Sequence, residues 1–303
     1  MSERIFYIDL FSKTNSNFYW LAAFRRLGTT SHFDTRNKKE RLESIILDFK
    51  PTHIHLGGSV KPGRSVNAGM LCRVKDKLGC SVSVFYGDAR YSEYHTELAR
   101  VVDYVYISNK THIQINAGKG FSNFRYLPCP TEPRIFRYYP AEIKYDLLFI
   151  GGSSGDYRRA LLKRVAKKFD LIVAGTQWKG MGFRYLPAIY GKEFSILCGQ
   201  AKISLGFNHN VGLTLDGYFS NRLPNLLASR AFVIQTYSKG LEKIFGNRKH
   251  LVWFKSEAEL FSIIAYYLKH PKERENIAKR GQQAILTHDT YDHHVKKIIR
   301  ECK

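Results

Sequence analysis

The middle of the chain restarts a strand–turn–helix unit. Residues 145–165 read YDLLFIGGSSGDYRRALLKRV: an apolar run, a turn of glycine and serine, and a basic segment of helical periodicity. A buried strand that enters a helix through a glycine turn is typical of parallel α/β sheets. The residues before 128 already alternate in this way, so the restart predicts two α/β domains in a chain of 303 residues.

The alternation can be followed along both halves, because the apolar runs are short and end at Gly, Pro or Asp. Strands are predicted at 4–10, 52–58, 81–87, 104–108, 124–130, 145–152, 170–176, 201–207, 231–236 and 250–254. Helices are predicted at 17–28, 38–50, 67–79, 95–103, 111–120, 156–169, 193–200, 220–229, 240–246, 256–270, 271–286 and 290–302. This order favours two doubly wound domains, whose ligands bind outside the carboxyl ends of the strands.

A proline-rich stretch separates the two halves. Residues 128–140, PCPTEPRIFRYYP, contain four prolines and should form an extended connector. We therefore expect a first domain over 1–140 and a second over 141–285. Residues 286–303 are expected to form a C-terminal helix that packs back toward the first domain.

The charge balance is strongly basic. The chain has 48 Lys and Arg against 26 Asp and Glu, a net charge of +22, and both halves contribute to the excess. Such a surface attracts polyanions, among them double-stranded DNA, an anionic membrane surface or an anionic polymer. The alternative is a protein that is merely basic.

The N-terminus enters a strand directly, without the charged and apolar segments of a signal peptide, and no apolar run is long enough to span a membrane. The five cysteines form no C-x-x-C pair and suggest reduced thiols in a cytoplasmic protein. They are Cys72, Cys80, Cys129, Cys198 and Cys302. No histidine has a partner at metal-ligand spacing, so we expect no metal site.

The glycine turn after residue 150 is suited to an anion. Gly151 and Gly152 allow close approach of the backbone, the next helix presents free N–H groups, and Arg158 lies in its first turns. The alternative is an ordinary tight turn before a solvated basic helix.

The stretch 216–245, DGYFSNRLPNLLASRAFVIQTYSKGLEKIF, is the most informative part of the chain. It places Arg222 near the start of a helix and Lys239 in a turn after the next strand. We expect the two cations to converge on a diphosphate at the carboxyl edge of the sheet.

This stretch resembles the CgeB-like, family-1-type glycosyltransferases, in which a D-G-Y-x-S-[DN]-R motif precedes a helix and a "GLE" turn. The tail, with "YYL", "PKERENIAKRG" and "HDTY", resembles the closing region of the same family. The likeness covers most of residues 50–295 and is strongest after Tyr145.

The resemblance implies a GT-B fold, in which two facing Rossmann-like domains each contain a parallel sheet. It also implies that the second domain binds a nucleotide sugar, that the first meets the acceptor, and that no metal is obligatory. The expected donor is a UDP-sugar, with no tightly bound cofactor. The donor-binding residues implied are Gly151, Gly152, Arg158, Gly175, Trp178, Asn221, Arg222, Lys239, Gly240 and Glu242.

Two positions depart from the family pattern: this chain has Asn225 where many retaining relatives have a glutamate, and Arg230 where they have a glycine. An inverting transferase also needs a base for the acceptor hydroxyl. Asp88, which follows a predicted strand of the first domain, is the first candidate, and Asp216 is the second. Asp88 could instead cap a turn, and a retaining reaction would need no base.

The function predicted is transfer of a hexosyl or pentosyl group from a nucleotide sugar to a hydroxyl acceptor. The charge makes a hydroxymethylated base in DNA one candidate acceptor, and the target base would then have to be exposed or flipped. The alternatives are a cell-envelope polymer, a protein or a lipid at the membrane surface as acceptor, or a non-catalytic nucleic-acid-binding protein.

Overall fold

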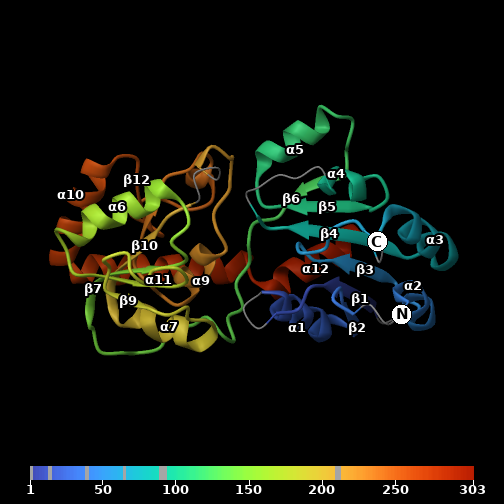
Figure 1. Ribbon diagram of the computed structural model, residues 1–303, viewed down its shortest axis with the longest axis horizontal. Coiled ribbons are helices and arrows are strands. Elements are labelled where there is room, and N and C mark those ends of the chain that lie inside the picture. Colours follow the sequence, from blue (N-terminus) through green and yellow to red (C-terminus); the bar gives the residue numbers. More distant parts are fainter. Residues whose placement is uncertain (1–2, 13–15, 38–40, 64–65, 89–93, 209–212) are drawn as a thin grey trace. The chain divides into compact units, whose positions relative to one another are not determined.

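The computed structural model describes residues 3–12, 16–37, 41–63, 66–88, 94–208 and 213–303. The chain divides into two compact units. The N-terminal unit comprises Met1–Pro128 and Tyr291–Lys303, and the C-terminal unit comprises Cys129–Thr290. Figure 1 shows that each unit is a sheet with helices packed against it.

The N-terminal unit contains a parallel six-stranded sheet of order β2-β1-β3-β4-β5-β6. Its strands are β1 (Arg4–Asp9), β2 (Thr29–Asp34), β3 (His53–Leu56), β4 (Ser81–Tyr86), β5 (Tyr104–Ile107) and β6 (Phe124–Tyr126). The chain runs from β1 to β2 on one side and then returns to β3 on the other, so the switch point of the sheet lies between β1 and β3.

Helices cover both faces of this sheet. They are α1 (Asn17–Leu27), α2 (Leu42–Phe49), α3 (Ala68–Leu78), α4 (Tyr94–Ala99), α5 (Lys110–Ala117) and α12 (Tyr291–Glu301). Trp20 of α1 packs on both His55 of β3 and Tyr291 of α12, so α1 and α12 share one face. Alternate strand residues such as Ile54 and Val82 join the apolar core with α2, α3 and α4 on the other face.

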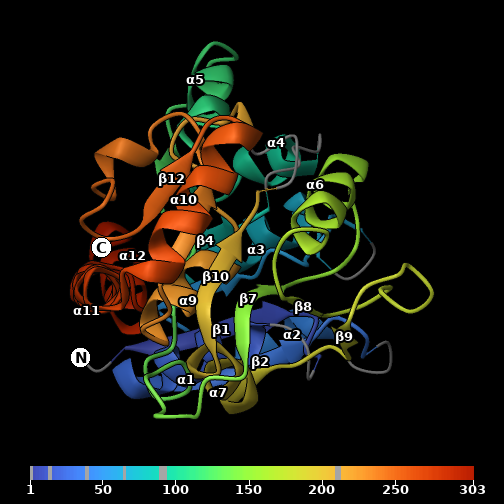
Figure 2. The same cartoon turned by 90° about the vertical axis from the view of Figure 1, so that its left-hand side faces the viewer.

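The C-terminal unit contains a second parallel sheet of six strands, of order β12-β11-β10-β7-β8-β9. Its strands are β7 (Tyr145–Ile150), β8 (Leu171–Ala174), β9 (Tyr185–Leu186), β10 (Ala201–Gly206), β11 (Val233–Thr236) and β12 (Val252–Phe254). Figure 2 faces this unit, with β7 and β10 side by side. The switch point lies between these two strands, because β8 follows β7 on the opposite side.

The helices of this unit are α6 (Asp156–Ala166), α7 (Gly191–Gly199), α9 (Arg222–Ala228), the 3₁₀ turn η1 (Leu241–Lys243), α10 (Glu257–Lys269) and α11 (Pro271–His288). Leu161 of α6 and Ile264 of α10 belong to the same buried cluster as Leu147 and Ile203 of the strands. The α/β class with a parallel sheet in each half is therefore confirmed.

Two strands were missed in the sequence. β2 lies at a sheet edge, and its residues TTSHFD are mostly polar and only partly buried, so they lack the apolar run that marks a central strand. β9 has only two residues, Tyr185 and Leu186, and also lies at an edge. Both edge strands are held by backbone pairing, which leaves little trace in side-chain pattern.

Candidate active site in the C-terminal unit

The turn after β7 is built on glycines that no other residue could replace without strain. Gly151 has a φ of +152° and Gly175, after β8, a φ of +149°. A Cβ on Gly175 would lie 2.2 Å from the carbonyl oxygen of Gly151. The backbones of the two turns therefore press together, and the N–H of Gly151 donates to Ala174 O at 2.7 Å.

Arg222 contacts the residues that follow both strands of the switch point. Its Nη1 donates to Phe207 O, just after β10, at 3.3 Å. Its Nη2 would lie 3.0 Å from a Cβ on Gly151, just after β7, and its guanidinium is 4.8 Å from the centre of the Phe149 ring. The first residue of α9 thus places a cation at the crevice where open α/β sheets bind ligands.

Arg158 approaches the same place from α6. It is 7% exposed, its Nη1 donates to Gly152 O at 3.2 Å, and its guanidinium lies 5.5 Å from the centre of the Phe149 ring. Its Nε is buried and has no hydrogen-bond partner. Two arginines from different helices therefore lie against the ring of one phenylalanine beside the glycine turn.

No carboxylate of the described residues forms an ion pair with either of these two cations. Across the described ranges, none of the ion pairs of the structure includes Arg158 or Arg222. Burial, together with the nearby Arg158 charge, lowers the pKa of Arg222 to about 9, and burial also lowers the pKa of Arg158. Both stay cationic near neutral pH, at a cost that a bound anion would offset.

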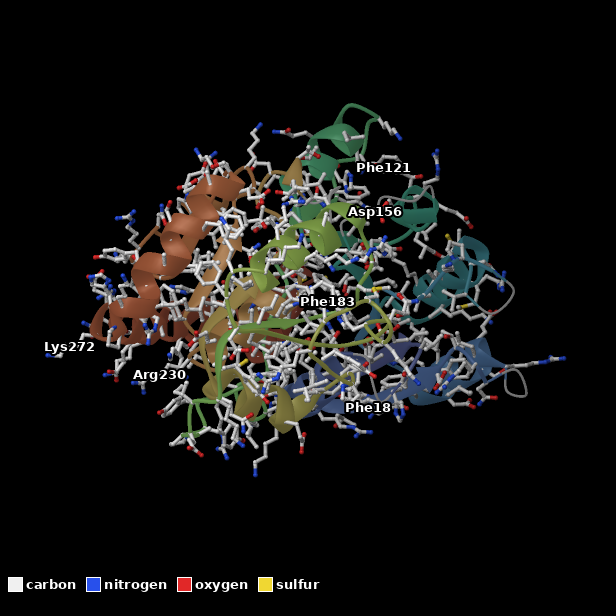
Figure 3. All side chains as sticks on the ribbon, turned by 60° about the vertical axis from the view of Figure 1, so that its left-hand side comes forward. Phe18, Phe121, Asp156, Phe183, Arg230 and Lys272 are labelled. Atoms are coloured by element: carbon white, nitrogen blue, oxygen red, sulfur yellow. The ribbon has the colours of Figure 1, made fainter. Side chains whose placement is uncertain are left out.

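Trp178 supports the glycine turn from within the unit. Its side chain is 1% exposed, and its indole N–H donates to Gly151 O at 2.7 Å. The ring packs edge-on against Phe183, which is labelled in Figure 3, and against Phe149. In this arrangement the indole is not available to stack on a base, and it fixes the carbonyl of the turn instead.

A second pair of loops meets at the carboxyl ends of β10 and β11. Gly240 has a φ of +82°, and a Cβ on it would lie 2.2 Å from Oδ1 of Asp216. The N–H of Gly217 donates to Lys239 O at 2.8 Å. Asp216 and the Lys239–Gly240 turn, far apart in the sequence, are therefore neighbours.

The other predicted donor residues are more exposed. Lys239 is exposed, and among the residues described no hydrogen bond or ion pair joins it to Arg222. Glu242, also exposed, accepts a hydrogen bond from Tyr237 Oη at 3.0 Å. Asn221 precedes α9, is exposed, and makes no side-chain capping bond. Roles for these three residues stay predictions.

Asn208 was missed by the sequence reasoning, although it is polar and follows a buried strand. It is 4% exposed; its Nδ2 lies 3.3 Å from Ser238 Oγ, and its Oδ1 accepts from Gln235 Nε2 at 3.3 Å. Since Phe207 O binds Arg222, Asn208 links the arginine side of the crevice to the loop that ends in Lys239.

The two departures from the family pattern have structural explanations. Arg230, also labelled in Figure 3, follows α9 with a φ of +59°, the conformation in which glycine is preferred after a helix. Its side chain forms an ion pair with Glu275 and lies over the Tyr138 ring. Asn225 Oδ1 accepts from Thr131 Oγ1 at 2.9 Å and so holds the segment that enters this unit.

The first candidate base belongs to the other unit. Asp88 follows β4 in the N-terminal unit and is exposed, and its role stays a prediction. Among the described residues no group of three or more His, Cys, Asp or Glu side chains could hold a metal ion. In the same part of the chain, no helix combines the length and the apolar character needed to cross a membrane.

The family relationship follows from the same part of the chain. Residues 158–300, which begin at Arg158 and include Arg222, match the family described as glycosyl transferase-like. This part of the protein is similar to a glycosyl transferase-like domain. The predicted resemblance to glycosyltransferases is confirmed at this level, whereas membership of the CgeB-like group stays a prediction. No curated protein sequence matches the chain.

Solved structures of similar fold extend over the whole chain, beyond the glycosyl transferase-like domain. HepE of Anabaena in complex with UDP has a TM-score of 0.68 at 10% identity, with 98% of this chain and 99% of that chain covered. An alpha-glucosyltransferase in complex with UDP-glucose and DNA containing an abasic site has a TM-score of 0.70 at 10% identity, with both chains covered completely (100%). A glycosyltransferase from Rickettsia africae has a TM-score of 0.70 at 10% identity, with 99% of this chain and 97% of that chain covered. The predicted GT-B fold is thereby confirmed.

Proposed function

We propose that the protein is a glycosyltransferase that moves a sugar from a UDP-sugar to a hydroxyl acceptor. The observation that carries this proposal is the pair Arg158, which is buried, and Arg222, which is partly buried, beside the glycine turn of Gly151. Neither cation forms an ion pair with a carboxylate of the described residues. A diphosphate supplies the missing negative charge and accepts hydrogen bonds from both guanidinium groups. UDP is the proposed nucleotide because HepE and the alpha-glucosyltransferase are in complexes with UDP or UDP-glucose.

The two arginines would act mainly in the transition state. The bond between the anomeric carbon and the diphosphate oxygen breaks, its electron pair leaves with UDP, and a bond forms to the acceptor oxygen. Arg158 and Arg222 stabilise the negative charge that grows on the diphosphate, in a partly buried place where that attraction is strong. In an inverting reaction, Asp88 or Asp216 would take the hydroxyl proton.

Trp178 and Asn208 would position this machinery without touching the sugar. Trp178 fixes the carbonyl of Gly151, and Asn208 fixes the segments that end at Phe207 and Ser238. We propose that Gly175 and Gly240 serve the same purpose, because each allows two backbone segments to approach more closely than a side chain would permit.

We propose a hydroxymethylated base in double-stranded DNA as the acceptor. The net charge of +22 supports a polyanionic partner. Near the β6 edge of the N-terminal unit three cations lie over aromatic rings, and none of them takes part in an ion pair of the described residues: Arg100 over Phe121, Lys110 over Tyr126 and Arg125 over Tyr104. Alternating basic and aromatic groups suit the phosphates and bases of a nucleic acid.

The donor proposal is tested by calorimetry with UDP, GDP and ADP, followed by UDP release from a panel of UDP-sugars. The acceptor proposal is tested by mass spectrometry of duplex DNA with and without 5-hydroxymethylcytosine after incubation with each donor. We expect UDP to bind and only the hydroxymethylated DNA to gain a sugar. If DNA binds in a salt-dependent way while no nucleotide binds, the protein is a nucleic-acid-binding protein without this activity. If UDP binds and the DNA stays unmodified, an envelope polymer or a protein becomes the acceptor to test.

A further inference from the structure

The N-terminal unit has a buried carboxylate at its own switch point. β1 ends at Asp9, and β2 and β3 lie on its two sides. The crevice of this sheet therefore opens between the segment that follows Asp9 and the segment that follows Leu56 of β3. Asp9 was included in a predicted strand and was not among the candidate site residues.

Asp9 joins three segments of the unit. It is 1% exposed, and it accepts hydrogen bonds from Tyr7 Oη of β1 at 2.7 Å and from the N–H of Leu10 at 2.8 Å. Ser59, after β3, adds backbone and side-chain hydrogen bonds. A Cβ on Gly57 would lie 1.7 Å from Oδ2 of Asp9, so a glycine is needed for the carboxylate to occupy this place.

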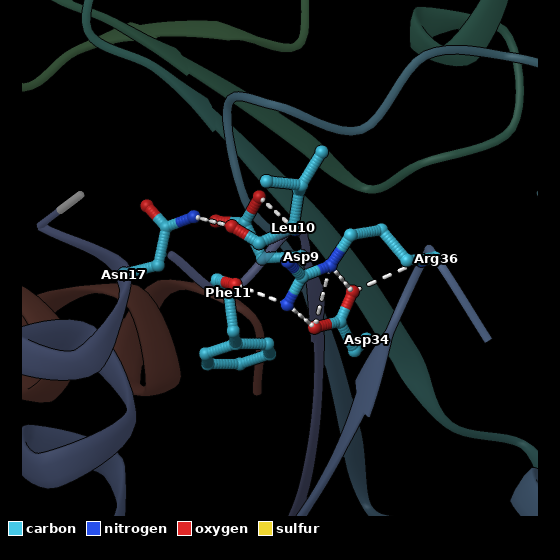
Figure 4. Close-up of polar contacts among 6 residues, drawn as sticks. All are labelled: Asp9, Leu10, Phe11, Asn17, Asp34 and Arg36. Atoms are coloured by element: carbon cyan, nitrogen blue, oxygen red, sulfur yellow. Dashed lines mark hydrogen bonds and ion pairs between the residues drawn. The ribbon is translucent and has the colours of Figure 1, made fainter. Parts of the chain in front are cut away.

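Side chains of α1 and of the segment after β2 also form hydrogen bonds with Leu10 and Phe11, which follow Asp9. Figure 4 shows that Asn17 of α1 donates to Leu10 O and that Arg36, after β2, donates to Phe11 O. Arg36 is in turn bound by Asp34, with which it forms an ion pair. Leu10 and Phe11 are therefore fixed on both sides, and Asp9 ties them to the Gly57–Ser59 segment.

The carboxylate is costly to keep ionised. None of the ion pairs within the described ranges includes Asp9, and Arg36, the cation drawn in Figure 4, pairs with Asp34. Burial raises the pKa of Asp9 to about 6, although the hydrogen bonds from Tyr7, Leu10 and Ser59 act in the opposite direction. A neutral side chain could tie loops together without this cost, so the charge itself calls for an explanation.

We propose that Asp9 is a positioning residue of the acceptor crevice, and that its ionised carboxylate holds the segments after β1 and β3 in the arrangement that receives the acceptor hydroxyl. This inference rests on the proposed glycosyltransferase function. It assigns to the N-terminal unit a residue that acts through its neighbours and does not itself touch the substrate.

The titratable groups in the neighbourhood of Asp9 have pKa values that are shifted away from that of Asp9, with the exception of His32. Burial holds the pKa of His55 well below its usual range, that of Tyr7 is raised well above it by burial, and the Arg36 hydrogen bond lowers that of Asp34. Burial also lowers the pKa of His32, which packs on Phe11. The charged and titratable groups around Asp9 are thus Tyr7, His32, Asp34, Arg36, His55 and, from α12, Tyr291. A variant of Asp9 distinguishes its titration from that of His32.

The experiment measures transfer from UDP-glucose to duplex DNA containing 5-hydroxymethylcytosine by the full chain between pH 5 and 8. Hydrolysis of UDP-glucose, in which water replaces the acceptor, is measured in parallel by UDP release. A pH profile of activity is then obtained even if this DNA is not the acceptor. For the wild type, activity should rise with pH and level off above about 6, because Asp9 must be ionised. In Asp9→Asn this inflection should disappear, the KM for the acceptor should rise about tenfold or more, and the Kd for UDP should stay within about twofold.

Three further variants keep the inference falsifiable if Asp9→Asn folds poorly. Tyr7→Phe removes a hydrogen bond that lowers the pKa of Asp9, so the inflection should move to higher pH, which a purely structural role would not cause. Gly57→Ala displaces the carboxylate and should raise the acceptor KM as Asp9→Asn does. Gly63→Ala is the matched control on the same segment, because among the described residues a Cβ there meets only Lys61 O, at 3.9 Å.

An unchanged inflection and acceptor KM in folded Asp9→Asn, or an inflection that Tyr7→Phe does not move, would overturn the inference. Failure of the wild type to bind UDP would overturn the proposed function instead. The two failures are therefore distinguishable, because the proposed UDP site is built from residues of the C-terminal unit and Asp9 belongs to the N-terminal unit.

Discussion

Replacement of Arg222 by methionine should stabilise the ligand-free protein and abolish its response to UDP. The positive charge of Arg222 lies near that of Arg158, and no ion pair of the described residues includes either arginine. Methionine fills a similar volume without a charge. Most substitutions at partly buried positions are destabilising, so the opposite sign in the ligand-free protein is a specific consequence of the unpaired cation.

The expected changes in the free energy of unfolding and in the Kd for UDP follow from the cost of burying the Arg222 charge. Burial lowers the pKa of Arg222 from its usual range to about 9, which corresponds to on the order of 5 kcal/mol against the charged form. Loss of the hydrogen bond to Phe207 O and of the contact with Phe149 offsets part of that gain, so the free energy of unfolding should rise by about 1–4 kcal/mol. Removal of one partner of a buried charge pair weakens the free energy of binding by about 2–5 kcal/mol. The Kd for UDP should therefore be about 30- to 5,000-fold higher in Arg222→Met.

Both quantities can be measured on one preparation. Urea unfolding without ligand reports the stability, and isothermal titration with UDP reports the Kd. Arg184→Met is the matched control, because Arg184 is an exposed arginine of the same unit that pairs with Asp170. The control should change neither quantity by more than about 0.5 kcal/mol.

Two outcomes would refute this reasoning. UDP affinity within about threefold of the wild type would show that Arg222 does not meet the diphosphate. A ligand-free Arg222→Met variant that is clearly less stable than the wild type would show that the cation is already well compensated in the fold.

Further predictions concern the glycine turn, the buried histidines and the thiols. Gly151→Ala should raise the Kd for UDP at least about tenfold by calorimetry, because its φ is +152° and its Cβ would lie 3.0 Å from Arg222 Nη2; unchanged affinity would contradict the site. Trp178→Phe leaves Gly151 O without its donor and should cost about 1–3 kcal/mol in urea unfolding, with weaker UDP binding. Burial lowers the pKa of His53 to about 4, so this neutral histidine contributes stability that is present above pH 6.5 and lost as the pH falls toward 4. Urea unfolding of the wild type should therefore give a lower free energy of unfolding at pH 5 than at pH 7, and His53 should contribute about 2 kcal/mol to that decrease. In His53→Gln this contribution should be absent. Protonation of Asp9 changes the free energy of unfolding in the opposite direction. Cys72 is exposed and Cys198 is buried, so a thiol reagent should label Cys72 rapidly and Cys198 only after unfolding, as a Cys72→Ser variant would verify.

Much of the candidate site could be predicted where a backbone conformation requires a particular residue type, because that residue is then visible in the sequence. The glycines at 151, 175 and 240 were predicted to line the site, and all three have positive φ values that other residues rarely adopt. Arg158 was predicted beside the turn because it follows it closely in the sequence, and it donates to Gly152 O. The role of Trp178 could not be predicted, because an aromatic residue after a glycine is compatible both with stacking on a base and with support of the turn from within.

The sequence by itself determined the class of fold and the place of the restart, because strand and helix formation depend on local periodicity and on the residues that end each element. Only the tertiary structure decided which charged side chains lie in the interior and form no ion pair among the described residues. Arg222 meets Gly151, and Asp9 meets Gly57, because strands that are distant in the chain are adjacent in each sheet, and the strand order is set by packing that no local pattern records. The cost of burying a charge depends on that surrounding structure, so Arg222 and Asp9 acquire their shifted pKa values only in the folded protein.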